Sequence, residues 1–218
     1  KSSNPVRELR YDNNDAAKGV AYMRALGVKY FMGFTPEAVT AASAQPGLMK
    51  VAQSGPWVIF RVSESDLVVP IAVQPVVVSM ASGDPRERWL EIGTSWFQHA
   101  DEWAALPADA GPQEWQHIDA KIDMTRREGE PGASGRRVDI VAPAQAIEPV
   151  ALPPVVVSNV EMGQSDVSFS VDKIGVPVLV RVSYFPNWKV DGATGPFRVA
   201  PNMMVVIPTS NNVKLQYG

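Results

Sequence analysis

The sequence predicts an α+β fold, with an N-terminal α/β part that carries a tryptophan-rich helix and a C-terminal antiparallel β-sandwich, jelly-roll-like in outline. Helix and strand patterns alternate over the first half of the chain, whereas short apolar runs between turn residues fill the last third. The 19 prolines and 16 glycines among 218 residues also favour short strands. We therefore expect two domains, residues 1–137 and 138–218.

The first elements form a helix, strand, helix pattern. Residues 15–26 place apolar side chains at helical spacing, and Gly27 follows as a C-terminal stop. Residues 28–32 are a short, mostly apolar strand. The run Thr35-Pro36-Glu37 supplies an N-cap, a proline in the first turn and an acid near the positive end of the helix dipole, so it predicts the start of a second helix.

Two β-prone segments follow this helix. Residues 49–53 and 57–62 flank a Ser-Gly-Pro turn and predict a hairpin. Residues 67–80 are rich in valine but contain Pro70 and Pro75, which cannot donate a hydrogen bond to a neighbouring strand. We expect two edge strands or an extended connector there.

The clearest helix starts at Asp84-Pro85 and is expected to reach about residue 103. Its tryptophans recur every seven residues, at Trp89, Trp96 and Trp103, and the opposite face is acidic. Such a stripe is most simply a core-packing face. A membrane-surface helix would carry lysine and arginine on its polar face, and a sugar-stacking platform would need an exposed indole, so these are the lesser alternatives.

Two polar runs carry carboxylates, and we predict a site in neither. Residues 104–137 are loop-rich. Flanking arginines would lower the pKa values of Glu128 and Glu130, whereas glycoside hydrolysis needs one carboxyl with a raised pKa as the general acid. Residues 12–15 offer oxygen ligands but lack the glycine and distal glutamate of a calcium loop. Asp15 is better interpreted as a helix N-cap.

The last third of the chain is almost purely β in pattern. Val167, Phe169 and Val171 alternate onto one face, and the run that begins at residue 176 also alternates, through Val178, Val180 and Val182. Short strands at this spacing, most with one apolar face, are typical of an antiparallel sandwich. The predicted strands are 138–141, 155–160, 167–171, 176–184, 197–199, 203–207 and 213–217.

Composition excludes several classes of function. A net charge of −3 argues against nucleic-acid binding, which needs a basic face. The chain has no cysteine and two separated histidines, so we predict no disulfide, metal site or cofactor. No apolar run approaches the roughly 18 residues of a spanning helix, and the chain starts at Lys1 without the basic and apolar regions of a signal peptide, so we expect a soluble piece of a larger protein.

Residues 180–192, VRVSYFPNWKVDG, carry a family resemblance, together with the stretches LGVKYFMGFTPEAV and SGPWVIFRVSESDLVVP and the tail from residue 200. These segments resemble the extracytoplasmic portion of YfhO-like bacterial membrane proteins and related GT-C-type multi-spanning glycosyltransferases, especially actinobacterial ones. The resemblance covers about half of the chain, which lacks the family's transmembrane helices. It implies a domain outside the cytoplasmic membrane, tethered to a bundle of spanning helices, with the family's catalytic acid in a loop between early transmembrane helices.

The same segment supplies the candidate ligand-binding residues. Trp188 lies where a predicted strand bends, and Lys189 and Asp191 flank it, so these side chains together with Tyr184 are candidates to hold a polar ligand such as a sugar. The alternative is structural, with a buried Trp188 and with Asp191 organising the turn at Gly192. We predict no catalytic residue.

Two hypotheses of function stay open at this stage. The first is a non-catalytic domain that binds or positions a cell-envelope glycan through aromatic stacking and hydrogen bonds. The second is a structural or interaction domain that packs on the transmembrane region of its parent chain or on a partner protein, and this one predicts a large exposed apolar patch. A free-standing hydrolase ranks last, because it needs paired carboxylates in a cleft.

Overall fold

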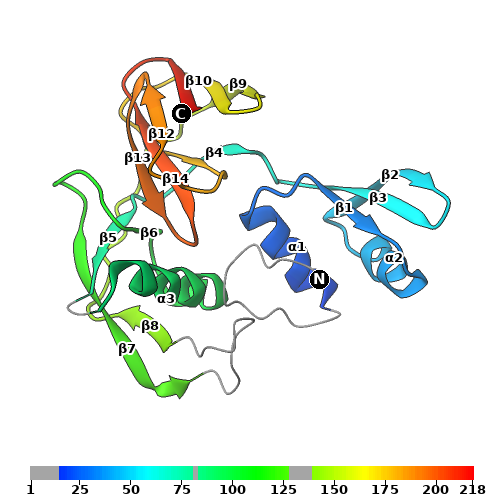
Figure 1. Ribbon diagram of the computed structural model, residues 1–218, viewed down its shortest axis with the longest axis horizontal. Coiled ribbons are helices and arrows are strands. Elements are labelled where there is room, and N and C mark those ends of the chain that lie inside the picture. Colours follow the sequence, from blue (N-terminus) through cyan, green and yellow to red (C-terminus); the bar gives the residue numbers. More distant parts are fainter. Residues whose placement is uncertain (1–14, 81–82, 128–138) are drawn as a thin grey trace. The chain divides into compact units, whose positions relative to one another are not determined.

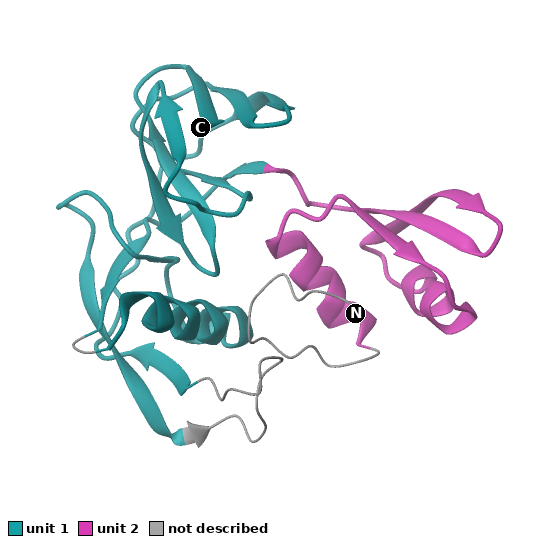
Figure 2. Cartoon of the chain, viewed as in Figure 1, with its two compact units in different colours: residues 1–10, 68–218 teal, residues 11–67 magenta. Residues whose placement is uncertain are grey.

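The computed structural model describes residues 15–80, 83–127 and 139–218, and its helices and sheets confirm the α+β fold (Figure 1). The described residues form two compact units, which meet in sequence between Leu67 and Val68 (Figure 2). The tryptophan-rich helix thus belongs to the same unit as the sandwich strands. The domain boundary expected between residues 137 and 138 lies outside the described residues.

The N-terminal unit contains the helix, strand, helix and hairpin that the sequence predicts. The Asp15 carboxylate caps the first helix by accepting a hydrogen bond of 2.9 Å from the Lys18 amide, and the Thr35 hydroxyl caps the second by accepting one of 3.2 Å from Ala38. Residues 12–14 of the rejected calcium run lie outside the described residues. The elements are α1 (Ala16–Ala25), β1 (Tyr30–Gly33), α2 (Pro36–Ser43), β2 (Leu48–Ser54) and β3 (Trp57–Val62).

One face of the N-terminal sheet is covered and the other is open. The sheet is antiparallel with strand order β1-β3-β2. Both helices pack on the face that presents Val58, Phe60 and Val62 of β3, where Phe60 is 1% exposed. The alternate residues of β3 therefore point away from the helices.

The C-terminal unit contains an eight-stranded and a four-stranded sheet. Their strand orders are β4-β11-β14-β13-β6-β5-β7-β8 and β12-β15-β10-β9. The strands are β4 (Val68–Pro70), β5 (Val76–Ser79), β6 (Pro107–Ala108), β7 (His117–Arg127), β8 (Asp139–Pro143), β9 (Val157–Met162), β10 (Asp166–Val171), β11 (Val178–Val180), β12 (Trp188–Asp191), β13 (Ala193–Val199), β14 (Met203–Pro208) and β15 (Asn212–Tyr217).

Each run predicted in the last third contains a strand, and the strands from β9 onward pair antiparallel. Val167, Phe169 and Val171 are buried on one face, as expected. The run that starts at residue 176 differs, because β11 ends at Val180 and is buried on both faces. β12 was expected as a bend and is an additional strand.

Two expectations for the middle of the chain need correction. β4 is an edge strand, but β5 lies inside the sheet, parallel to both β6 and β7. Pro75 precedes β5 and so removes no hydrogen bond from it. β7 extends through part of the run expected as a loop, where Ile118, Ala120 and Ile122 alternate with polar residues.

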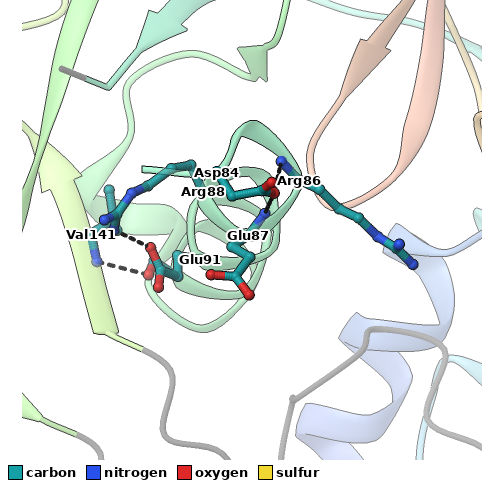
Figure 3. Close-up of polar contacts among 7 residues, drawn as sticks. Asp84, Arg86, Glu87, Arg88, Glu91 and Val141 are labelled. Carbon is teal, nitrogen blue, oxygen red and sulfur yellow. Dashed lines mark hydrogen bonds and ion pairs between the residues drawn. The ribbon is translucent and has the colours of Figure 1, made fainter. Parts of the chain in front are cut away.

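The tryptophan-rich helix, α3 (Pro85–Gln98), packs on the eight-stranded sheet. The Asp84 carboxylate caps it by accepting hydrogen bonds from the Arg86 and Glu87 amides at 2.9 and 3.1 Å (Figure 3). The helix ends before the predicted residue 103, and a 3₁₀ turn, η1 (Ala100–Glu102), follows. Trp89 and Trp103 are at most 5% exposed, which confirms the core-packing interpretation of the stripe.

Two layers cover the same face of the eight-stranded sheet. α3 contacts the β5, β7 and β8 end through the apolar cluster that holds Val76, Val78 and Trp89. At the other end, β11 and β14 turn Val178, Val180, Met204 and Val206 to that face, all fully buried in the sandwich. Between these ends lies β13, whose Arg198 pairs with Met204 and so points to the same face.

Ser95 offers a test of the α3 contact. It is fully buried, and its hydroxyl accepts a hydrogen bond of 2.8 Å from the Val141 amide of β8. Ser95→Ala leaves that buried N–H without its acceptor, so we expect the free energy of unfolding to fall by about 1–3 kcal/mol. Urea denaturation measures this. Ser158→Ala, at an exposed position of β9, is the matched control, and an equal effect of the two substitutions would contradict the assignment.

Candidate functional site

The four predicted ligand-binding residues lie in three different environments. Trp188 pairs with Tyr217 across β12 and β15, and its neighbour pair Val190 and Leu215 shows that this face is the inner one, because Leu215 is fully buried. Lys189 and Asp191 alternate onto the outer, exposed face. Trp188 and these two side chains therefore lie on opposite faces of the sheet and do not form one binding site.

Trp188 has a structural contact of its own. Its indole Nε1 donates a hydrogen bond of 3.2 Å to the Ser183 carbonyl, which follows β11, and its ring lies 5.4 Å from that of Tyr217. The half-buried indole thus joins the edge of the four-stranded sheet to the chain that leaves the eight-stranded sheet. The reversal after Asp191 depends on Gly192, whose φ is 74° and whose carbonyl accepts from the Thr209 and Ser210 amides.

Asp191 lines a polar groove on the outer face of the four-stranded sheet, with a volume of about 310 Å³. Its floor carries a chain of hydrogen bonds, in which the Asn159 amide donates to the Ser170 hydroxyl at 3.3 Å and that hydroxyl donates to the Asn212 side-chain oxygen at 3.0 Å. Glu161, Ser168 and Lys214 also line it. The groove thus offers both hydrogen-bond donors and acceptors to a polar ligand.

Tyr184 belongs to a second site, built around Arg198. The Arg198 guanidinium lies 4.9 Å from the ring centre of Trp89 and 5.8 Å from that of Tyr184. Its Nε donates a hydrogen bond of 2.8 Å to the Asn202 side-chain oxygen. The two rings and the amide hold the half-buried guanidinium in one place.

Arg198 lines a pocket of about 450 Å³ between the first turns of α3 and the strands β5 and β13. Asp109 reaches the same pocket from the end of β6, where its amide donates to the Arg198 carbonyl at 3.1 Å. Burial raises the pKa of the Asp109 carboxyl, and Arg198 opposes that rise. Burial also lowers the pKa of Arg198, which Asp109 offsets. The remaining walls are Val78, Met80, Gly83, Pro85, Arg86, Arg88, Trp89 and Ile92.

The N-terminal unit carries a third feature, an apolar surface on the open face of its sheet. Tyr30 and Met32 of β1, Met49 of β2 and Trp57 of β3 are each 45–61% exposed. Phe34, half exposed, continues the alternation beyond β1 and lies 4.6 Å from the Trp57 ring. We call these five side chains the apolar sheet face.

Neither of the last two features was predicted as a site. Arg86, Asp109 and Arg198 are far apart in sequence and match no motif, so only the fold brings them together. The apolar sheet face had a signal, because Tyr30-Met32-Phe34 and Trp57-Ile59 keep apolar residues on both faces of a strand. Glu128 and Glu130, rejected as an acid/base pair, lie outside the described residues.

Comparison of the chain with protein-family models, with curated proteins and with solved structures found no match. Within residues 15–80, 83–127 and 139–218, no three histidine or acidic side chains come together as a metal site. None of the helices in that part of the chain has the length and apolar character needed to cross a bilayer.

The raised pKa of Asp109 predicts how pH changes stability. A carboxyl whose pKa is higher in the folded than in the unfolded protein binds more protons when folded, so its contribution to stability falls as the pH rises from its ordinary pKa of 3.8 through the folded value. Asp109→Asn removes this titration. Relative to this variant, we expect the wild type to lose free energy of unfolding between about pH 3 and pH 7 in urea titrations. A relative gain of the wild type over that range would show that attraction to Arg198 outweighs burial.

Proposed function

We propose that this chain is a non-catalytic interaction domain that rests on a membrane surface through its apolar sheet face. The observation that carries the proposal is the exposure of Tyr30, Met32, Phe34, Met49 and Trp57 on one face of one sheet. Exposed apolar surface costs free energy in water, and a contiguous patch marks a binding surface more often than isolated apolar residues do.

The composition of the face favours a bilayer as its occupant. Tyrosine and tryptophan side chains combine an apolar body with a polar tip and are enriched at the membrane–water boundary. The strands β1, β2 and β3 contain no aspartate or glutamate. Arg61 pairs with Tyr30 and Met49 and so lies on this face, whereas Lys50 pairs with Phe60 on the helix-covered face. Lys29 adds a second cation, 5.8 Å from the Tyr30 ring centre. Such a surface suits anionic lipid headgroups.

The resemblance to YfhO-like and GT-C-type membrane proteins supports the same location. A domain tethered to spanning helices is held close to the bilayer, so even weak attraction to lipid fixes its orientation. We propose the extracytoplasmic side of a bacterial membrane for this domain, with the transmembrane region of the parent chain as its neighbour. Its role is then to support chemistry done elsewhere in that protein.

Vesicle binding tests the membrane proposal. We expect the chain to sediment with vesicles of phosphatidylcholine and phosphatidylglycerol, and less with phosphatidylcholine alone. The double substitution Phe34→Ser and Trp57→Ser should weaken binding at least about tenfold, because it removes two apolar anchors. The matched control is Met162→Ser with Ile174→Ser, at exposed apolar positions of the C-terminal unit. Absence of vesicle binding, or equal loss in both double variants, would overturn the proposal.

A second candidate function is binding of a cell-envelope glycan, and the polar groove around Asp191 favours it. Asparagine, serine and carboxylate side chains on an open sheet face can satisfy the hydroxyls of a sugar chain. The aromatic rings expected to stack on sugars lie elsewhere, because Phe169 is the one aromatic side chain among the described residues that line the groove, and it is buried. The groove would therefore hold a glycan through hydrogen bonds alone.

Glycan panels test this second function. Arabinan, galactan and mannan oligosaccharides should include a ligand of about millimolar affinity in ligand-detected NMR, and Asp191→Ala should reduce its binding several-fold by removing an acceptor. Lys189→Ala, two residues away on the same strand and outside the groove lining, is the control. Absence of binding across the panel would exclude the function.

A further inference from the structure

The pocket at Arg198 holds a cation whose hydrogen-bonding capacity is not used up. A guanidinium has five N–H donors. In the described part of the chain, Arg198 donates one hydrogen bond, from Nε to Asn202, and its terminal nitrogens donate none. Those nitrogens are not fully buried, and the Arg198 side chain lines the pocket. Trp89 and Tyr184 restrict the guanidinium, which is therefore positioned before any ligand arrives.

A second cation reaches the same pocket. Arg86 lies in the first turn of α3, and its side chain forms no ion pair with any residue that the structure describes. Its charge is near enough to lower the pKa of Arg198. Arg88 differs, because its Nη1 lies 2.7 Å from the buried Glu91 carboxylate, and Figure 3 shows the side chains of Arg86 and Arg88 leaving the helix in different directions.

This arrangement is costly without a ligand. The exposed Arg86 guanidinium repels the half-buried guanidinium of Arg198, and desolvation penalises the charged form of Arg198. The Asp109 carboxylate is the negative group that lines the pocket near these arginines. Among the described residues it forms no ion pair with Arg198 at 4 Å or less. An anion between Arg86 and Arg198 would relieve the charge repulsion and accept hydrogen bonds from the terminal nitrogens of Arg198.

The remaining walls narrow the class of anion. Val78, Met80 and Ile92 are apolar, and Met80 is the more exposed of the three, so the pocket offers some apolar surface to a ligand with a carbon skeleton. Asp109 would repel a second negative group but can accept hydrogen bonds from hydroxyls. A volume of about 450 Å³ has room for one sugar residue.

We propose that the Arg198 pocket binds a hydroxylated anion, namely a sugar that carries one carboxylate or phosphate group. Arg198 and Arg86 hold the acidic group, and Asp109 accepts a hydroxyl. This site is independent of the apolar sheet face and shares no lining residue with the groove at Asp191. A negative result for either proposed function therefore does not decide whether this pocket binds a ligand.

Isothermal titration with simple probes tests the proposal on the full chain. The probes are glucuronate, glucose 1-phosphate, glucose and inorganic phosphate. We expect the charged sugars to bind with millimolar or tighter dissociation constants, and glucose and inorganic phosphate to bind at least about tenfold more weakly. Glucuronate and glucose 1-phosphate distinguish a carboxylate from a phosphate ligand. If neither binds, or if glucose binds as tightly, the proposal is wrong.

Matched variants locate the binding. Arg198→Gln and Arg86→Gln should each raise the dissociation constants of the charged sugars at least about tenfold, because each removes a charge-assisted contact. Arg86 is exposed and its guanidinium has no partner in the described structure, so its substitution leaves the fold intact even if Arg198→Gln does not. Arg61→Gln, at an exposed position of β3, is the control. Unchanged binding in Arg86→Gln would overturn the assignment.

Asp109→Asn separates the two halves of the site. Removing the carboxylate should tighten the binding of inorganic phosphate, because it removes a charge repulsion. It should also reduce the preference for glucose 1-phosphate over phosphate, because it weakens the hydrogen bond to a sugar hydroxyl. If inorganic phosphate binds wild type as tightly as glucose 1-phosphate does, the site is a plain anion site and the sugar assignment fails.

Discussion

The C-terminal unit depends on the burial of β14 on both of its faces. Met203 and Val205 pack on one side with Leu179 and Val199, while Met204 and Val206 are fully buried on the other side, within the sandwich. A strand with no solvent-exposed face cannot shift its register by one residue without exchanging two packed surfaces. β14 therefore fixes the positions of the strands that pair with it, β11 and β13.

The Arg198 pocket follows from that constraint. Arg198 pairs with Met204 and must point to the side of the sheet that α3 and the four-stranded sheet cover. Its position on β13 lies between the two covering layers, so the side chain is half-buried, neither packed into a core nor free in water. The same alternation places Ala108 on the opposite side and Asp109 beside the guanidinium. The pocket is thus a consequence of covering one long sheet with two separate layers.

Local chemistry made most of the elements predictable from the sequence. Asp15, Thr35 and Asp84 are N-caps because each side chain can accept hydrogen bonds from free amides of the first turn, and this depends on a few adjacent residues. The inner position of β5 was not predictable in the same way. It depends on parallel pairing with β6 and β7, which residues around Pro75 do not specify.

The sites were less predictable than the elements, for a related reason. A motif shows residues that are close in sequence, whereas residues 86, 109 and 198 meet through helix packing and strand register. The apolar sheet face was open to prediction, since Tyr30, Met32 and Trp57 alternate with apolar residues that the structure packs under the helices. An apolar residue on the second face of a strand has the same appearance in sequence whether a layer covers it or not.

The segment around Trp188 shows how a motif can report geometry and not chemistry. Its indole donates to the Ser183 carbonyl, Gly192 takes a positive φ that side chains disfavour, and a Cβ there would collide with the Asn212 carbonyl. Each of these roles requires one residue type, and each is met by packing or backbone conformation alone. A resemblance centred on this segment therefore bears on how the sandwich is closed. Ligand binding is argued from side chains that the fold leaves open to a groove or a pocket, and these include Asp191 of this segment and Arg198.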